Sequence, residues 1–206
     1  MPCVSIEGLI GSGKTSFINY LKNTNLKAEY IDEPVEQFMN YKNFNPLAEL
    51  KHNAFASQLH IIKSLGEHYK QYSDFAKRNQ TQIIITERDL YSPFVFTDTL
   101  YRNKNISDFE KEMLYDAIFD MIKTTEFPET RAIFYMKAEP KDCLQRVEKR
   151  NRMGEKNNVD INYLNNLQIS YNNHLMKWNK PLWSAHNDTN DMSSLFIEFK
   201  NFIKNV

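Results

Sequence analysis

One stretch of the sequence has the residue types and the spacing of a phosphate-binding loop. Residues 8–15 read Gly-Leu-Ile-Gly-Ser-Gly-Lys-Thr and match the pattern G-x-x-x-x-G-K-[ST]. They follow a short apolar run, and Phe17, Ile18 and Leu21 then recur at helical spacing. In such a loop, glycines let backbone N–H groups turn toward phosphate oxygens, and the helix N-terminus adds partial positive charge. We therefore predict a nucleoside triphosphate site rather than a glycine-rich turn without a ligand.

The side chains of this loop have separate expected roles. Lys14 would reach the β- and γ-phosphates, and the Thr15 hydroxyl would hold Mg²⁺. The residues expected to bind the nucleotide are Gly8, Gly11, Ser12, Gly13, Lys14 and Thr15. Such a loop serves many reactions, so it leaves the phosphate acceptor open.

Charged residues follow two further apolar runs. Glu33-Pro34-Val35 comes after residues 28–31, and Glu87-Arg88-Asp89 comes after residues 82–86. The carboxyl ends of parallel strands face the ligand crevice, so we expect both groups beside the phosphate loop. Taken separately, Glu33 could be a solvated loop acid, and Glu87 with Arg88 an ordinary ion pair. Their joint placement at two strand ends favours a catalytic site.

A basic helix end forms the third group. Arg146 and Arg150 are four residues apart and share one helical face, and Arg152 follows. Residues 151–160 are charged and have no apolar period, which predicts a mobile loop. A lid over about residues 146–160 would bring guanidinium groups onto the transferring phosphoryl group and exclude water. The alternative is a plain solvated surface.

The elements that must position these groups are strands alternating with helices. Short β-rich runs lie at residues 3–6, 28–31, 82–86 and 131–136, and a weaker fifth strand is expected near 181–185. Such alternation predicts parallel β-α units. We predict one α/β domain over residues 1–206 with a P-loop NTPase fold. It would have a parallel, five-stranded sheet flanked by helices, a closing helix at residues 195–203 and a lid loop.

Three stretches carry apolar residues at spacings of three and four, so we predict helices that bury these faces in the core. The first face comprises Phe55, Leu59, Ile62, Leu65, Tyr69 and Tyr72. The second comprises Phe109, Met113, Ala117, Ile118, Met121 and Ile122, and the third Leu164, Leu167, Tyr171, Leu175 and Trp178.

The composition excludes several classes of protein. The 206 residues include 26 basic and 26 acidic ones, and this zero net charge argues against a nucleic acid polymer as partner. No apolar run approaches the roughly 18 residues of a transmembrane helix, so no membrane partner is expected. Cys3 and Cys143 are too few for a disulfide framework or a metal cluster and indicate a reducing compartment. We expect a cytoplasmic location and leave organelle targeting open.

In their order and spacing, these motifs resemble the deoxynucleoside kinase family, which includes deoxycytidine, deoxyguanosine and mitochondrial thymidine kinases and the insect multisubstrate enzyme. The resemblance runs from about Cys3 to Trp178. It rests on the phosphate loop, Glu33-Pro34-Val35-Glu36, Gln58, Glu87-Arg88, the series Arg146, Arg150, Arg152 and Glu155, and Tyr163-Leu164 at the start of a helix.

The resemblance implies ATP-dependent phosphorylation of the 5′-hydroxyl of a deoxynucleoside, with Mg²⁺ and in a homodimer formed through the apolar-striped helices. Lys14 would act on the phosphates, Glu33 would accept the hydroxyl proton, and Arg88 would hold that hydroxyl and the base. Glu87 would join Thr15 at Mg²⁺. The resemblance further implies that Gln58 contacts the nucleobase edge, that Glu155 contacts the 3′-hydroxyl, and that Arg146, Arg150 and Arg152 contact the ATP phosphates.

Some positions depart from the family's pattern. Phe38 stands where the family usually has Trp, and Phe96 is a candidate base-stacking ring. Pro93 stands where deoxycytidine and purine kinases have an Asp, and this favours thymidine or another pyrimidine deoxynucleoside. The tyrosine that commonly contacts the 3′-hydroxyl does not align, so Tyr41 or His52 would have to replace it.

Two other functions compete with this one. A nucleoside monophosphate kinase of the thymidylate type shares the phosphate loop and the lid, but Glu33 favours a hydroxyl acceptor because a carboxylate would repel a phosphate. A P-loop regulator that binds nucleotide without catalysis is the other candidate. The candidate base and the full arginine set argue against it.

Overall fold

The computed structural model describes residues 2–39, 45–78, 83–152, 154–155, 158–187 and 191–206. Its strands form one parallel sheet in the order β2-β3-β1-β4-β5. They are β1 (Cys3–Glu7), β2 (Ala28–Ile31), β3 (Ile83–Glu87), β4 (Thr130–Lys137) and β5 (Leu182–His186). The predicted α/β class and five parallel strands are confirmed, and no strand bound differs from the prediction by more than one residue; Gln82 lies outside the described residues.

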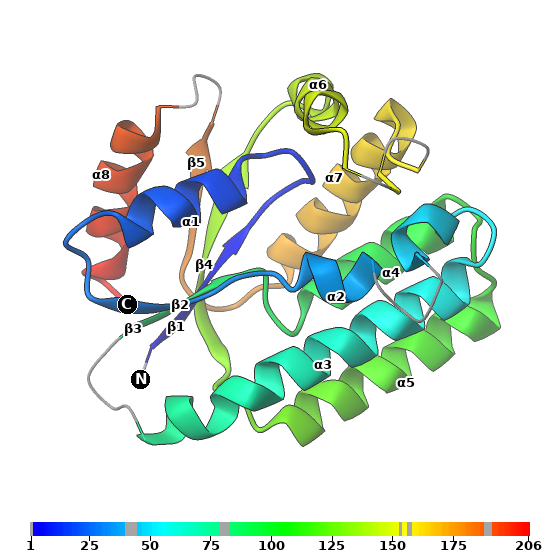
Figure 1. Cartoon of the computed structure of the whole chain (residues 1–206), viewed down its shortest axis with the longest axis horizontal. Coiled ribbons are helices and arrows are strands. Elements are labelled where there is room, and N and C mark those ends of the chain that lie inside the picture. Colours follow the sequence, from blue (N-terminus) through cyan, green and yellow to red (C-terminus); the bar gives the residue numbers. More distant parts are fainter. Residues whose placement is uncertain (1, 40–44, 79–82, 153, 156–157, 188–190) are drawn as a thin grey trace.

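Helices cover both faces of this sheet. They are α1 (Lys14–Lys22), α2 (Val35–Met39), the 3₁₀ turn η1 (Pro46–Glu49), α3 (Ala54–Arg78), α4 (Ser92–Arg102), α5 (Asp108–Thr125), α6 (Pro140–Arg150), α7 (Ile161–Met176) and α8 (Met192–Ile203). Figure 1 shows α1 and α8 on one side of the sheet and α3, α4, α5 and α7 on the other. In the described part of the chain, no helix is long and apolar enough to cross a membrane.

The side of the sheet under α1 and α8 is closed by aromatic packing. The rings of Phe17 and Phe134 lie 5.7 Å apart, and Phe199 of α8 meets both rings edge-on at 5.7 and 5.1 Å. All three side chains are fully buried. Edge-to-face aromatic contacts add to the hydrophobic effect, so this cluster holds α1, and with it the phosphate loop, against the sheet.

The predicted closing helix is present and begins three residues earlier than expected, at Met192. Its first turn is capped by Asp191, whose side chain accepts hydrogen bonds from the backbone N–H groups of Ser193 and Ser194 at 3.0 and 3.3 Å. Such an N-cap satisfies donors that the first helical turn leaves unpaired. The helix therefore starts at the cap and not at the first apolar residue of its buried face.

The prediction that every residue of the apolar stripes is buried was wrong at three positions. Leu59, Phe109 and Met113 are 40%, 73% and 45% exposed. In α5 the buried residues are Leu114, Ile118, Met121 and Thr125. Met113 precedes Leu114 by one position, which turns it by about 100° around the helix and away from α3. The buried stripe of α5 is therefore shifted around the helix relative to the predicted face and includes Leu114 and Thr125.

Residues 146–150 of the expected lid belong to α6, and the described residues of 151–160 form turns and no regular element, as expected of a loop. Several of them are nevertheless buried, among them Glu155, Asn158 and Val159. The Asn158 side-chain amide donates to the carbonyl of Ala48 in η1 at 3.0 Å. This segment is thus held against η1.

Candidate functional site

The phosphate loop joins β1 to α1 at the carboxyl edge of the sheet. Gly11 and Gly13 have φ values of +84° and +96°, which side chains rarely tolerate. A Cβ at Gly13 would lie 2.4 Å from Nδ2 of Asn187, whose amide donates to the carbonyl of Ser12 at 2.7 Å. Glycine is therefore required there because the loop after β5 approaches so closely.

Lys14 reaches back over this loop. Its Nζ donates to the carbonyls of Gly8 and Leu9 at 3.1 and 2.9 Å. Burial, assisted by the nearby Arg88 guanidinium, lowers the pKa of Lys14 to about 8. A buried ammonium held by two carbonyls can turn toward an anion, because a phosphate oxygen is a better acceptor than a neutral carbonyl.

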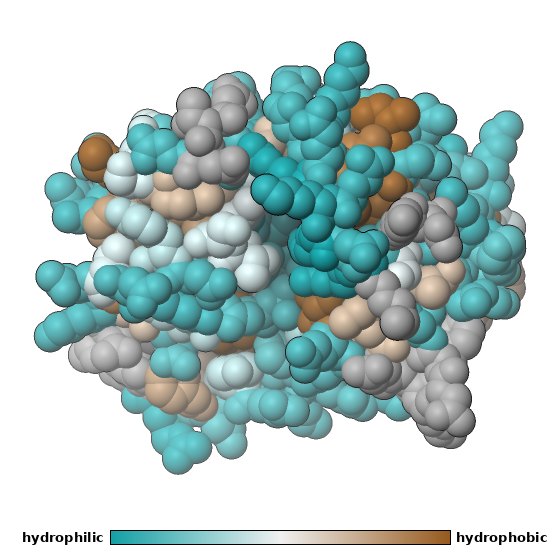
Figure 2. Space-filling model, turned by 45° about the horizontal axis from the view of Figure 1, so that its top comes forward, coloured by the Kyte–Doolittle hydropathy of each residue, from teal (hydrophilic) through white to brown (hydrophobic). Residues whose placement is uncertain are grey.

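A cavity of about 460 Å³ opens beside this loop. Figure 2 shows hydrophilic residues around a hollow on this face. Gly11, Gly13, Lys14 and Thr15 line one end, and Glu33, Glu87 and Arg88 line the wall where β2 and β3 end. The predicted convergence of the two strand ends on the phosphate loop is present in the structure.

Thr15 and Glu87 meet directly. The Thr15 hydroxyl donates to Oε1 of Glu87 at 2.7 Å. Burial and the neighbouring Glu33 charge raise the pKa of Glu87. A bound cation would offset both effects, and a hydroxyl and a carboxylate oxygen are ligands of the kind that Mg²⁺ prefers. The residues present therefore fit a magnesium ion held between the phosphate loop and the end of β3.

Arg88 is the centre of the site. It adopts a left-handed φ of +67°, and its Nε donates to Oε1 of Glu33 at 2.9 Å. Its guanidinium carbon lies 4.6 Å above the ring of Phe96. The side chains of Arg88 and Glu33 are 5% and 19% exposed, so the carboxylate reaches the cavity while the cation is almost enclosed.

The far end of the cavity is mostly apolar. The predicted base-contacting residues Phe38, Gln58, Pro93 and Phe96 all line it, together with Leu50, Ile61, Leu65 and Leu100. Gln58 is the one polar member of this group. Its Nε2 donates to the carbonyl of Pro93 at 3.3 Å and to the Thr97 hydroxyl at 3.4 Å. These contacts fix the amide at the cavity wall.

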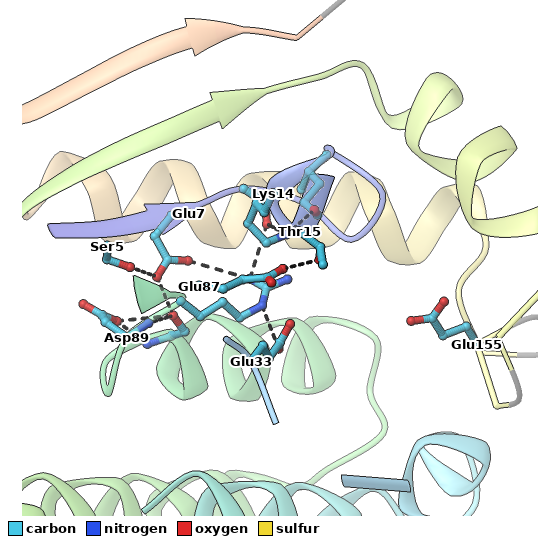
Figure 3. A network of polar contacts seen from close by, with 12 residues as sticks. Ser5, Glu7, Lys14, Thr15, Glu33, Glu87, Asp89 and Glu155 are labelled. Carbon is cyan, nitrogen blue, oxygen red and sulfur yellow. Dashed lines mark hydrogen bonds and ion pairs between the residues drawn. The ribbon is translucent and has the colours of Figure 1, made fainter. Parts of the chain in front are cut away.

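The three predicted lid arginines also line the cavity. Arg146 donates to the carbonyls of Gly11 and Asn187 at 3.3 and 3.0 Å. Arg150 and Arg152 both pair with Glu155, at 2.6 and 3.2 Å. Figure 3 places Glu155 apart from the cluster around Glu33. Arg146 is thus tied to the phosphate loop, whereas the other two arginines share the Glu155 carboxylate.

Some predicted residues lie elsewhere. Gly8 and Ser12 are outside the cavity lining, and the buried Ser12 hydroxyl has no hydrogen-bond partner among the described residues. His52 is exposed and does not line the cavity, and Tyr41 lies outside the described residues. Tyr163 does line it, with its side chain buried. Among the described tyrosines, it is the one that lines the cavity.

Sequence reasoning missed a set of buried polar residues behind Arg88. Glu7 accepts hydrogen bonds from the hydroxyls of Ser5, Ser92 and Tyr171 at 2.8, 2.7 and 2.9 Å. Asp89 accepts from the backbone N–H of Ser92 at 2.9 Å, and burial together with Glu7 raises the pKa of Asp89 to about 7. The only signal in the sequence is that Glu7 directly precedes the phosphate loop.

Comparisons with known proteins agree with this geometry. The family model for deoxynucleoside kinases matches residues 4–206. The chain is 27% identical over 178 residues to mitochondrial thymidine kinase 2 of Homo sapiens, covering 84% of this chain and 64% of that protein. It is 24% identical over 196 residues to deoxycytidine kinase of Mus musculus, covering 84% of this chain and 75% of that protein. The chain thus spans less than two thirds of the length of the human relative.

The match to the family model covers nearly the whole chain, including the phosphate loop, both strand ends and the arginine series. The resemblance drawn from the sequence is confirmed, and the chain belongs to the deoxynucleoside kinase family.

Proposed function

We propose that this protein transfers the γ-phosphoryl group of ATP to the 5′-hydroxyl of a deoxynucleoside, giving a deoxynucleoside monophosphate and ADP for nucleotide salvage. The observation that carries the proposal is the Glu33 carboxylate, which reaches the cavity from the end of β2 and is held by Arg88 beside the phosphate loop. A carboxylate at that place suits an alcohol acceptor.

The donor nucleotide would lie along the phosphate loop. Backbone N–H groups at the start of α1, with Lys14, would hold the phosphates. Thr15 and Glu87 would hold Mg²⁺, which neutralises charge on the transferring group when bound. Arg146, Arg150 and Arg152 would complete the charge stabilisation as the lid over residues 146–160 closes, within one domain formed by residues 1–206.

The acceptor would lie between Glu33 and the apolar end of the cavity. Glu33 would take the proton of the 5′-hydroxyl, and Arg88 would orient that hydroxyl. Phosphoryl transfer needs positioning and charge stabilisation far more than covalent chemistry, so two oriented side chains suffice on this side. Glu155 would contact the 3′-hydroxyl, and Tyr163 is placed to assist it.

We further propose a preference for thymidine or another pyrimidine deoxynucleoside. Phe38 and Phe96 offer aromatic faces, and Gln58, whose Nε2 donates to Pro93 and Thr97, offers its Oε1 as an acceptor for a base edge. Pro93 provides no carboxylate at the position where relatives that accept cytosine or purines carry one.

The exposed side chains of Phe109, Met113 and Phe119 on α5 and Met176 at the end of α7 support the proposed homodimer.

An initial-rate panel tests the proposal. ATP and Mg²⁺ would be offered with each of the four deoxynucleosides and with thymidine monophosphate. We expect thymidine to be phosphorylated and the monophosphate to be inert. Preference for a purine deoxynucleoside would overturn the base assignment, and turnover of the monophosphate alone would favour a nucleoside monophosphate kinase. No turnover with any acceptor would leave a nucleotide-binding regulator.

A further inference from the structure

We propose that Glu7 and Tyr171 are positioning residues that fix the Arg88 guanidinium for the reaction at Glu33. The inference rests on the proposed kinase function and adds two residues to it. Glu7 and Tyr171 come from β1 and α7, and both are 2% exposed. Neither Glu7 nor Tyr171 is among the described residues that line the cavity, so both would act through Arg88.

The two oxygens of Glu7 have different partners. Oε1 accepts from the hydroxyls of Ser5 and Ser92, which anchor the carboxylate to β1 and to the start of α4. Oε2 accepts from the Tyr171 hydroxyl at 2.9 Å and lies 3.7 Å from Nη1 of Arg88. One oxygen therefore holds Glu7 in place and the other faces the guanidinium.

Tyr171 connects this carboxylate to the guanidinium, and the direction of the chain of hydrogen bonds is fixed. Arg88 Nη1 can only donate, so the Tyr171 oxygen must accept from it. The Tyr171 hydroxyl proton is then directed at Glu7. Because each group has a single compatible role, the arrangement selects one orientation of the guanidinium.

This orientation decides what Arg88 presents to the cavity. Nη1 is occupied by Tyr171 and by the carbonyl of Gly8 at 3.3 Å, and Nε is directed at Glu33. Figure 3 shows the labelled Glu7 and Glu33 carboxylates as separate members of the same network. The Arg88 guanidinium is thus held between two carboxylates. Glu7 lies on its buried side and Glu33 on its cavity side.

The backbone of Arg88 is held independently of these two residues. Its N–H donates to the carbonyl of Ile6 at 3.1 Å, and its carbonyl accepts from the Tyr69 hydroxyl at 2.8 Å. These bonds maintain the left-handed backbone conformation, which persists only where its surroundings over-determine it. Removing the Tyr171 hydroxyl should therefore release the side chain and leave the backbone in place.

Tyr171→Phe is the principal test, with Tyr115→Phe as its matched control. Tyr115 also donates a hydroxyl hydrogen bond to a carboxylate, that of Asp98 at 2.7 Å, away from the cavity. We expect Tyr171→Phe to lower kcat by about tenfold to a hundredfold, since a misplacement of about 1 Å costs roughly that much. The Kd of a non-hydrolysable ATP analogue should not change, and Tyr115→Phe should keep the wild-type kcat. Equal effects of the two variants on kcat would overturn the proposal.

A double-mutant cycle with Arg88→Lys shows whether the effect passes through Arg88. If it does, Tyr171→Phe lowers kcat much less in the Arg88→Lys background than in the wild type. The lysine variant has no guanidinium group for Tyr171 to position. Fully additive losses would contradict the proposal. Glu7→Gln should resemble Tyr171→Phe in both backgrounds, and the tyrosine variant decides the matter if the glutamine variant fails to fold.

A spectroscopic measurement separates this proposal from the proposed function. With ¹⁵N-labelled arginine, the Nη groups of Arg88 should give separate NMR signals in the wild-type protein because rotation about the Nε–Cζ bond is hindered. They should average in Tyr171→Phe and remain separate in Tyr115→Phe. Averaged signals in the wild type would contradict the positioning role, whereas a wild type with resolved signals and no kinase activity would contradict only the proposed function.

Discussion

Nε of Arg88 lies 2.9 Å from Oε1 of Glu33, so the residues that follow two neighbouring strands are joined across the carboxyl edge of the sheet. Among the described residues no hydrogen bond reaches the second oxygen of Glu33, and this carboxylate lines the cavity and is partly exposed. If Glu33 is the base proposed above, it is already held in the cavity before a hydroxyl group arrives.

Glu33→Gln is expected to lower kcat by about 10²–10⁴-fold, the usual contribution of a general base. The amide keeps the size of the side chain and cannot take a proton, so the variant should fold and bind a non-hydrolysable ATP analogue as the wild type does. Steady-state kinetics and calorimetry measure both quantities. Asp32→Asn is the control, because Asp32 is exposed and pairs with Lys22 outside the cavity. An unchanged kcat in Glu33→Gln with a loss in Asp32→Asn would move the base to Asp32.

The parts of the fold and site that the sequence predicts are those encoded locally. The phosphate loop is a contiguous motif, Glu33 follows one apolar run, and Glu87 with Arg88 follows another. Because parallel strands align their carboxyl ends, knowing the strands is enough to bring these residues together. The positions of the strands follow from periodicity in the same way.

The residues behind the site could not be predicted, because their roles depend on contacts between distant segments. The spacing of Tyr171 assigns it to an apolar helix face, and its hydroxyl finds a role only because α7 brings it to Glu7, 164 positions away in the chain. Likewise, the exposure of Phe109 depends on which side of α5 faces α3. Periodicity gives the existence of a stripe and leaves its edges undetermined.

Glu155→Gln is expected to raise the KM for thymidine by about tenfold to a hundredfold, since a hydrogen bond to a charged group contributes roughly 1.5–3 kcal/mol. The loss should be absent with 3′-deoxythymidine, which lacks the hydroxyl that Glu155 is proposed to contact. Kinetics with both nucleosides test this. Glu148→Gln, an exposed position on α6, should leave the ratio of the two KM values at the wild-type level. A wild type that does not discriminate between the two nucleosides would argue against a role for Glu155 in sugar recognition.

Gln58→Leu is expected to weaken thymidine binding by about tenfold to a hundredfold, because it removes the polar side chain that lies among the apolar residues at the far end of the cavity. The Kd of the ATP analogue should not change, since Gln58 lies away from the phosphate loop. Calorimetric titration with each ligand measures the two affinities. Gln37→Leu on the exposed side of α2 is the control. A Gln58→Leu variant that binds thymidine like the wild type would place the base elsewhere.

The stability of the protein in acid should depend on Asp98, which joins α4 to α5 and α7. Burial opposes its charged form, but hydrogen bonds from His174 and Tyr115 and the nearby Lys111 ammonium outweigh burial and lower the pKa of Asp98 to about 2. The folded-state pKa lies below the unfolded value of 3.8, so the charged group stabilises the fold above pH 3.8. That stabilisation, about 2 kcal/mol for a shift of this size, is lost as the pH falls toward 2.

Urea denaturation of Asp98→Asn against the wild type measures this contribution. The difference in the free energy of unfolding should be largest near pH 6 and shrink as the pH falls below about 4. Asp116→Asn, at an exposed position on α5, should show a small difference that does not vary with pH. A difference for Asp98→Asn that stays constant down to pH 2.5 would show that Asp98 is not responsible.

The contact between Asn187 and the carbonyl of Ser12 joins residues 175 positions apart, so the order of synthesis matters. The ribosome makes the phosphate loop well before the amide of Asn187 that closes it from behind. Even β1 pairs only with strands made much later, β3 and β4. During translation the nascent chain therefore carries an open phosphate loop. A nucleotide bound at this closed loop can stabilise the fold only after Asn187 has left the exit tunnel.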